Sequence, residues 1–151
     1  MSTTSAISQP ALSIEGLLGG RRVLQVKQRT ALDWVSVIRQ GLSSAAVDSL
    51  AKTLRVTQSE LAVALGIPER TLARRKKEGT LNSEESAKLV RLARVVGRAR
   101  ETFEDLDTAL DWLKSPNAAL SGATPLSLLD TDIGAESVME TLGRIEHGVF
   151  A

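Results

Sequence analysis

The strongest constraint on the fold is the stretch TQSELAVALGIPERTLARR, which occupies residues 57–75. Thr57 and Glu60 have the spacing of a capping box, in which each side chain accepts a hydrogen bond from the backbone N–H of the other residue. Gly66 suits the left-handed residue that ends a helix, and Pro68 is favoured where the next helix begins. The stretch therefore predicts two short helices joined by a tight turn, which is the helix-turn-helix arrangement.

The second of these helices is strongly basic. Leu72 is predicted to point inward, and most of the other residues of this helix are predicted to face outward. Positive charge on a helix in the major groove neutralises phosphates and releases counterions, and Arg and Thr side chains can contact base edges. Gln58, at the start of the first helix, is expected to hold a phosphate together with nearby amides. The candidate DNA-binding residues are Gln58, Arg70, Thr71, Arg74, Arg75, Lys76 and Lys77.

Two alternatives limit this interpretation. The basic run from Arg74 to Lys77 is more uniform than base readout needs, so part of it is expected to contact phosphates alone, or to be an ordinary solvated face.

The order Thr-Gln-x-Glu-Leu-Ala-x-x-Leu-Gly-Ile, followed by Thr-Leu-x-Arg, resembles the Xre/Cro/phage-repressor family. Ser43 or Ser44 is expected to cap the preceding helix, and the resemblance implies that this helix supports the second, DNA-reading helix of the motif from behind. The competing reading is a plain helical hairpin in an all-α core, because a motif is only a hypothesis.

Composition favours an all-α protein and narrows its surroundings. The 151 residues allow one domain or two small ones, and abundant Ala, Leu and Arg with few aromatic residues favour helix over sheet. The absence of cysteine excludes disulfides and thiolate zinc sites and is compatible with a reducing cytoplasm. No apolar run approaches the roughly 18 residues of a membrane span, and residues 1–10 lack signal-peptide features. We therefore expect a cytoplasmic protein with no membrane partner.

Charge is divided unevenly along the chain. The net charge is +1, but residues 52–100 carry twelve basic and five acidic side chains, whereas residues 101–151 carry two and ten. This division suggests two different partners. We expect a disordered or irregular segment at residues 1–29, a helix-turn-helix DNA-binding domain at 30–104 and a small helical domain at 105–151.

Several local expectations accompany these boundaries. Residues 13–20 suggest a short helical turn, and residues 21–29 leave strand and loop undecided. Thr30 resembles an N-cap for a helix whose inward stripe is Ala31, Trp34, Val35 and Ile38. Asn82 and Glu85 form a second capping box, which predicts a long helix over residues 83–103. On that helix Arg91, Arg94 and Arg98 are expected to be solvated or paired with the acidic segment.

The last third of the chain has a pattern of its own. We expect a helix capped by Asp105, a turn over residues 117–120, a short helix over 126–129 and a last helix after Gly134. The spaced residues of this pattern are Trp112, Leu113, Pro116, Asn117, Leu120, Gly122, Pro125, Leu126, Leu128, Leu129, Thr131, Gly134, Val138, Leu142, Arg144, Ile145 and Gly148. They resemble the toxin-binding domain of Xre/MbcA/ParS antitoxins.

With both halves in this order, the chain resembles a full-length antitoxin of the Xre–RES type. The resemblance implies a partner toxin with a RES domain that consumes NAD, repression of the shared operon, and a homodimer within a toxin–antitoxin hetero-oligomer. The candidate toxin-binding residues are Arg144, His147, Gly148, Val149, Phe150 and Ala151. For Arg144 and His147 the alternative is a helix end whose cations are stabilised by the helix dipole.

The sequence gives little support for the hypothesis that the protein is an enzyme. His147 is the single histidine and there is no cysteine, so a His/Cys metal cluster and a Ser-His relay are not expected. No nucleotide-binding fingerprint is present, because Leu17-Leu18-Gly19-Gly20 lacks the required glycine spacing. We therefore expect no catalytic residues, metal or cofactor. The competing functions are a stand-alone regulator whose acidic half mediates dimerisation and, more remotely, an enzyme with an unrecognised site.

Overall fold

The computed structural model describes residues 13–24 and 30–148, and its architecture is all-α, as predicted. Within these residues there is no β-strand, only an isolated bridge between Ser43 and Thr80. The same residues include no helix that is both long and apolar enough to cross a membrane. The helices, in chain order, are α2 (Ile14–Leu17), α3 (Arg21–Leu24), α4 (Asp33–Gln40), α5 (Ala45–Leu54), α6 (Gln58–Leu65), α7 (Glu69–Glu78), α8 (Ser83–Phe103), α9 (Leu106–Leu113), η2 (Ala118–Leu120), η3 (Pro125–Leu128) and α10 (Asp132–Glu146).

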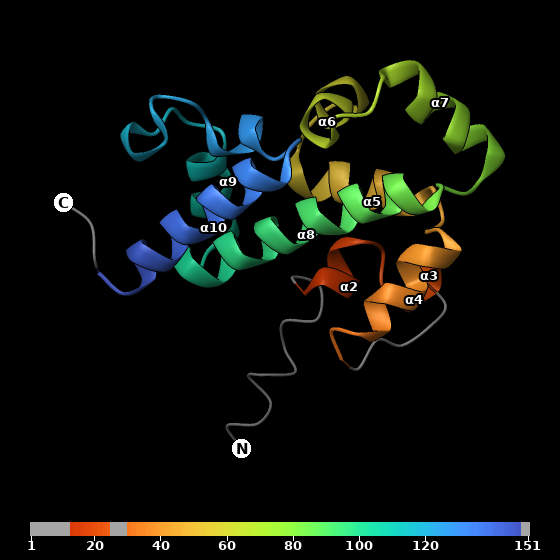
Figure 1. Ribbon diagram of the computed structural model, residues 1–151, viewed down its shortest axis with the longest axis horizontal. Coiled ribbons are helices and arrows are strands. Elements are labelled where there is room, and N and C mark those ends of the chain that lie inside the picture. The colour runs from red at the N-terminus through yellow and green to blue at the C-terminus, as the bar shows by residue number, and fades with distance from the viewer. Residues whose placement is uncertain (1–12, 25–29, 149–151) are drawn as a thin grey trace.

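Helix α8 is the central helix, and helices from both halves of the chain pack against it. The predicted capping box is present at its start, where Asn82 Oδ1 accepts from the Glu85 amide at 2.7 Å and Glu85 Oε1 accepts from the Asn82 amide at 2.9 Å. The helix packs against α2, α4 and α6 as well as α9 and α10, and Figure 1 shows the first set toward one end and the last two toward the other. Its buried side chains belong to a single core that extends from Leu17 to Leu142.

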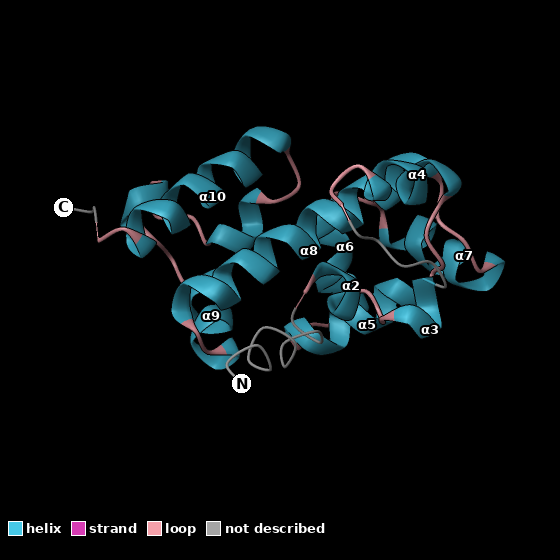
Figure 2. Ribbon diagram, turned by 90° about the horizontal axis from the view of Figure 1, so that it is seen from below, coloured by secondary structure: helices cyan, strands magenta, loops and turns pink. Residues whose placement is uncertain are grey.

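The helix-turn-helix consists of α6 and α7, and its local signals act as predicted. Thr57 Oγ1 accepts from the Glu60 amide at 3.0 Å, and Glu60 Oε1 accepts from the Thr57 amide at 2.8 Å. Gly66 then ends α6 with a φ of 70°, in the left-handed region that favours glycine. Pro68 has an extended backbone just before α7, which Gly79 ends. Figures 1 and 2 both place α7 at one end of the molecule, away from the end of α10.

Two expectations for the first forty residues were wrong. Residues 21–24 form the helical turn α3 rather than strand or loop, because Gly19 and Gly20 adopt positive φ and redirect the chain. The short helical turn expected over residues 13–20 is present as α2, and Leu17 and Leu18 are fully buried, so this part of residues 1–29 packs against the core instead of being irregular. The predictions for residues 1–12 and 25–29 lie outside the described residues.

The inward face of α4 also differs from the predicted stripe. The helix begins at Asp33, whose carboxylate accepts from the Thr30 amide at 2.9 Å, so Thr30 is not the N-cap. Trp34 and Ile38 pack against the core as predicted, but Val37 packs there in place of Val35, which is 37% exposed. Thr30 and Ala31 are exposed as well.

The acidic half follows its predicted turns, with one correction. Asp105 Oδ2 caps α9 by accepting from the Thr108 amide at 2.9 Å, and η2 and η3 occupy the two predicted turns. Gly134 does not precede the last helix but lies inside α10, where its amide donates to the N-cap oxygen of Thr131 at 2.9 Å. A side chain on Gly134 would overlap the Leu128 carbonyl oxygen, which explains the glycine.

Candidate functional site

The basic face of α7 is the first candidate site. Arg70, Arg74 and Lys77 are spaced at i, i+4 and i+7, so they share one face of the helix, and all three are exposed. Thr71 borders this face and is partly buried. Arg74 Nε lies 3.8 Å from Glu78 Oε2, an exposed pair of the kind that contributes little. These four side chains are positioned to meet an anionic surface.

Arg75 occupies a different position from its neighbours. Its side chain is 21% exposed, and its guanidinium contacts two carboxylates: Nε lies 2.8 Å from Glu85 Oε1 and Nη1 lies 2.9 Å from Glu78 Oε1. The hydrogen bond with Glu85, followed by the one with Glu78, raises the pKa of Arg75 above its usual value. Arg75 therefore connects α7 to α8.

Lys76 and Gln58 also have partners inside the molecule. Lys76 Nζ lies 2.9 Å from Asp48 Oδ1 on α5 and donates to Gln58 Oε1 at 2.7 Å. The lysine thus joins α7 to the two helices before it. Gln58, which we predicted to hold a phosphate, lies next to this lysine at the N-terminus of α6, so the structure brings two of the predicted DNA-binding residues together.

The end of α10 is the second candidate site. Arg144, His147 and Gly148 are exposed there, and Gly148 has a φ of 71°. Arg144 borders three shallow hollows, whose other walls include Trp112, Ala119 and Glu140. Among residues 13–24 and 30–148, no ion-pair or hydrogen-bond partner contacts the side chain of Arg144 or His147. Val149, Phe150 and Ala151 lie outside the described residues.

Two basic residues of α8 pair with carboxylates of the acidic half. Arg91 pairs with Asp132, and Arg98 Nη2 lies 2.7 Å from Glu146 Oε1. This agrees with the expectation that these arginines pair with the acidic segment, whereas Arg94 is exposed. Arg91 and Arg98 therefore link α8 to α10, two helices that also share the buried core.

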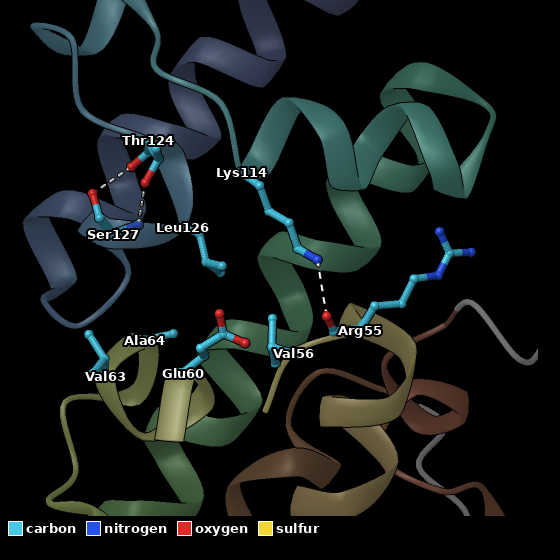
Figure 3. Close-up of a pocket in the computed structure, with 9 residues that line it drawn as sticks. All are labelled: Arg55, Val56, Glu60, Val63, Ala64, Lys114, Thr124, Leu126 and Ser127. Atoms are coloured by element: carbon cyan, nitrogen blue, oxygen red, sulfur yellow. Dashed lines mark hydrogen bonds between the residues drawn. The ribbon is translucent and has the colours of Figure 1, made fainter. Parts of the chain in front are cut away.

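A groove between α6 and the acidic half was not predicted. Its lining includes the apolar side chains of Val56, Val63 and Leu126, and Figure 3 shows Leu126 on the η3 side facing Glu60, with Val56 and Val63 to either side of Glu60. Lys114 Nζ donates to the carbonyl oxygen of Arg55 at 3.3 Å across one end of this groove. The sequence offered no signal for it, because its walls come from segments about sixty residues apart.

Carboxylates that contact the basic helix were also missed. The capping spacing pointed to Glu85 as part of the α8 cap, but not as the partner of Arg75. Asp48, the partner of Lys76, has no distinguishing sequence context. Over the described residues, no cluster of His, Cys, Asp or Glu is arranged to hold a metal ion.

Two family models match the chain in adjacent segments. The antitoxin Xre-like helix-turn-helix domain matches residues 33–94, and the antitoxin Xre/MbcA/ParS C-terminal toxin-binding domain matches residues 98–148. The two models meet inside α8.

Individual proteins show the same likeness. Antitoxin Xre of Yersinia enterocolitica serotype O:8 / biotype 1B is 37% identical over 119 residues, which cover 78% of this chain and 80% of that protein. A Prs ADP-ribosylating antitoxin of Sphingobium sp. (strain YBL2) is 28% identical over 130 residues, covering 80% and 82%. A crystal structure of the M. tuberculosis MbcT–MbcA toxin–antitoxin complex contains a chain with the same fold, with a TM-score of 0.54 at 24% identity, covering 72% of this chain and 96% of that one. The chain therefore belongs to the Xre family of antitoxins, with an Xre-like helix-turn-helix followed by an Xre/MbcA/ParS toxin-binding domain.

Proposed function

We propose that this antitoxin neutralises a RES-domain toxin that consumes NAD, and that it represses its own operon by binding operator DNA. The observation that carries the proposal is the pairing of an exposed basic helix with a toxin-binding domain in one chain. The two candidate surfaces lie at opposite ends of the molecule in both ribbon views, so one chain can contact DNA and toxin together (Figures 1 and 2).

In the DNA-bound state, α7 lies in the major groove. Arg70, Thr71, Arg74 and Lys77 face the DNA, with Arg74 and Thr71 nearest the base edges. Arg75 and Lys76 were candidates as well, but their carboxylate partners compete with phosphates for their charge. One helix reads only a few base pairs, so we infer that a homodimer binds a pseudo-palindromic site.

The DNA proposal is tested by single substitutions measured over a range of salt concentrations. Arg74→Ala is expected to cost about 1–3 kcal/mol at the operator if it reads a base. Lys77→Ala is expected to weaken binding to all sequences alike and to lower the salt slope by about one. Wild-type affinity that does not change between low and moderate salt would contradict DNA binding by this helix.

For toxin neutralisation we propose that the end of α10 covers or enters the toxin's NAD pocket. Arg144 and His147 are one turn apart and both exposed, so they can contact one partner surface together. Phe150 would fill apolar space in the pocket, and the cations would pair with acidic or phosphate-binding surroundings. The alternative is that the tail folds back on the acidic domain or closes the antitoxin dimer.

The partner is identified by pull-down of the tagged chain from its native cell. Inhibition is then tested with deletion of residues 148–151 and, separately, with Arg144→Ala, using NAD consumption as the activity and size-exclusion chromatography for the complex. Both variants are expected to inhibit less than wild type at equimolar protein. Full inhibition by both would move the contact to the helices upstream.

Analysis of the reaction products, added to the NAD assay, separates two kinds of toxin. One of the relatives is named a Prs ADP-ribosylating antitoxin, and ADP-ribosylation also consumes NAD. A toxin that hydrolyses the nicotinamide–ribose bond of NAD with water releases nicotinamide and free ADP-ribose, whereas an ADP-ribosylating toxin releases nicotinamide and transfers the ADP-ribose to a protein. Release of free ADP-ribose without a modified protein supports the first reaction, which is the one we propose.

A further inference from the structure

The recognition helix has very few apolar anchors. Of the residues of α7, all of which the structure describes, only Leu72 is buried. The helix is joined to the rest of the fold at its first turn by Gly66, Ile67 and Pro68, and at its end by the Ser44 amide, which donates to the Gly79 carbonyl at 3.0 Å. One buried leucine in the helix, even with Ile67 and Leu81 buried just outside its two ends, does not by itself fix the rotation of the helix about its own axis. Its side-chain contacts must therefore contribute to its orientation.

Glu85 provides the most buried of these contacts. The residue is 7% exposed, and its Oε1 accepts from Arg75 Nε at 2.8 Å and from the Asn82 amide at 2.9 Å. The Asn82 bond fixes the carboxylate on the first turn of α8, the helix that carries the core. Hydrogen bonds between ionised partners are shorter and stronger than neutral ones, and a guanidinium has a fixed planar geometry. The contact therefore constrains direction as well as distance.

We propose that Glu85 is a positioning residue for DNA recognition, which holds Arg75 so that Arg70, Thr71, Arg74 and Lys77 keep their outward face. This inference rests on the proposed binding of DNA by α7. Arg75 lies one residue after Arg74, so a rotation of the helix that breaks the Arg75–Glu85 contact also turns Arg74 away from its position. Glu85 itself is buried, so its role does not require contact with DNA.

The direction in which DNA affinity changes when Glu85 is replaced distinguishes a positioning role from a simple charge effect. A carboxylate near a DNA-binding face repels phosphates, so removing it on charge grounds alone raises DNA affinity. Glu84 supplies the matched control, because it precedes Glu85, is exposed and has no ion-pair partner among the described residues. If Glu85 positions the helix, its removal lowers operator affinity instead.

Three variants of the full chain separate the roles. Glu85→Gln removes the charge but keeps an oxygen for the capping box, which tolerates Gln at this position. Arg75→Met removes the guanidinium and keeps the stem, and Glu84→Gln is the control. The first readout is amide hydrogen exchange of residues 70–79 in the DNA-free protein, which reports how firmly α7 is held. The second is affinity for the DNA directly upstream of the chain's own gene against a scrambled duplex of equal length.

Glu85→Gln and Arg75→Met are expected to have the same effect on both readouts. Both should speed exchange in α7 by roughly five- to tenfold, as expected when a charge-assisted hydrogen bond is weakened. Both should lower the ratio of upstream to scrambled affinity by roughly 5- to 100-fold, the discrimination of one misplaced base contact. The double variant should lose no more than either single one, since the residues act as a unit. Glu84→Gln should bind both duplexes slightly more tightly and leave exchange unchanged.

Other outcomes would overturn the inference. Glu85→Gln that behaves like Glu84→Gln in both readouts removes the positioning role, as does faster exchange with an unchanged affinity ratio. A lower salt slope in Arg75→Met that Glu85→Gln does not share makes Arg75 a direct phosphate contact. Failure of the wild type to bind either duplex refutes the proposed DNA binding and this inference with it, whereas wild-type discrimination with unaffected variants refutes this inference alone.

Discussion

Replacement of Leu72 by alanine tests how α7 is held to the core. The side chain is 0% exposed and is the one buried side chain of α7. Loss of three carbon atoms costs roughly 2.4 kcal/mol at about 0.8 kcal/mol per methylene. The cavity left beneath α7 raises the expected loss of unfolding free energy to about 3 kcal/mol, within the 2–5 kcal/mol typical of buried Leu→Ala changes.

The measurement is urea unfolding followed by far-ultraviolet circular dichroism, with a thermal melt beside it. For a chain of this size, a loss of about 3 kcal/mol lowers Tm by roughly 6–12 °C. Leu32→Ala is the matched control, because Leu32 is 78% exposed and its truncation should change stability by less than about 0.5 kcal/mol. A cost below about 1 kcal/mol for Leu72→Ala would refute the reasoning, since α7 would then open separately or be held by its ion pairs instead.

Two further predictions concern the glycine in α10 and acid stability. Gly134→Ala should destabilise the fold by about 1–3 kcal/mol in a thermal melt, because its Cβ overlaps the Leu128 carbonyl oxygen. Gly143→Ala, with open space around it, should be neutral or stabilising by up to about 1 kcal/mol, and equal effects would contradict this contrast. Hydrogen bonds from the backbone and side chain of Thr57 lower the pKa of Glu60, so this contact stabilises the fold fully above the ordinary pKa of a glutamate and is lost as pH falls through the folded-state pKa. Glu60→Gln should therefore flatten the acid limb of a stability–pH curve, and an unchanged limb would exclude this contribution.

The elements that could be predicted from the sequence are those whose signals are local. A capping box needs two residues three positions apart, so Thr57 and Asn82 predicted the starts of α6 and α8. Gly66 and Gly79 likewise marked helix ends, because only local backbone geometry decides them. The acidic half was predicted by the same kind of signal, with N-caps at Asp105 and turns at known spacing.

The elements that were missed depend on distant partners. The apolar stripe of α4 was ambiguous, because Val35 and Val37 are equally apolar and only packing against α8 selects one of them. Gly134 looks like a helix breaker in the sequence, whereas the reason for it is the close approach of a carbonyl from η3. The candidate DNA-binding residues were chosen by charge and by position in the motif, and neither reveals that Arg75 has a buried carboxylate beside it.

The uneven charge of the chain illustrates the same limit at the scale of the whole molecule. We interpreted the basic middle and the acidic end as a sign of two external partners. In the structure, part of this charge is neutralised internally, because Asp107 pairs with Arg55 at 2.8 Å and Glu146 pairs with Arg98. Arg55 lies in the segment that the helix-turn-helix model matches, and Arg98 lies in α8. Both pairs therefore join these parts of the chain to the acidic half. The boundary predicted at residues 104 and 105 would leave α9 and α10 without the helix they pack on, so a fragment that begins before Ser83 is the better test of whether the toxin-binding half folds alone.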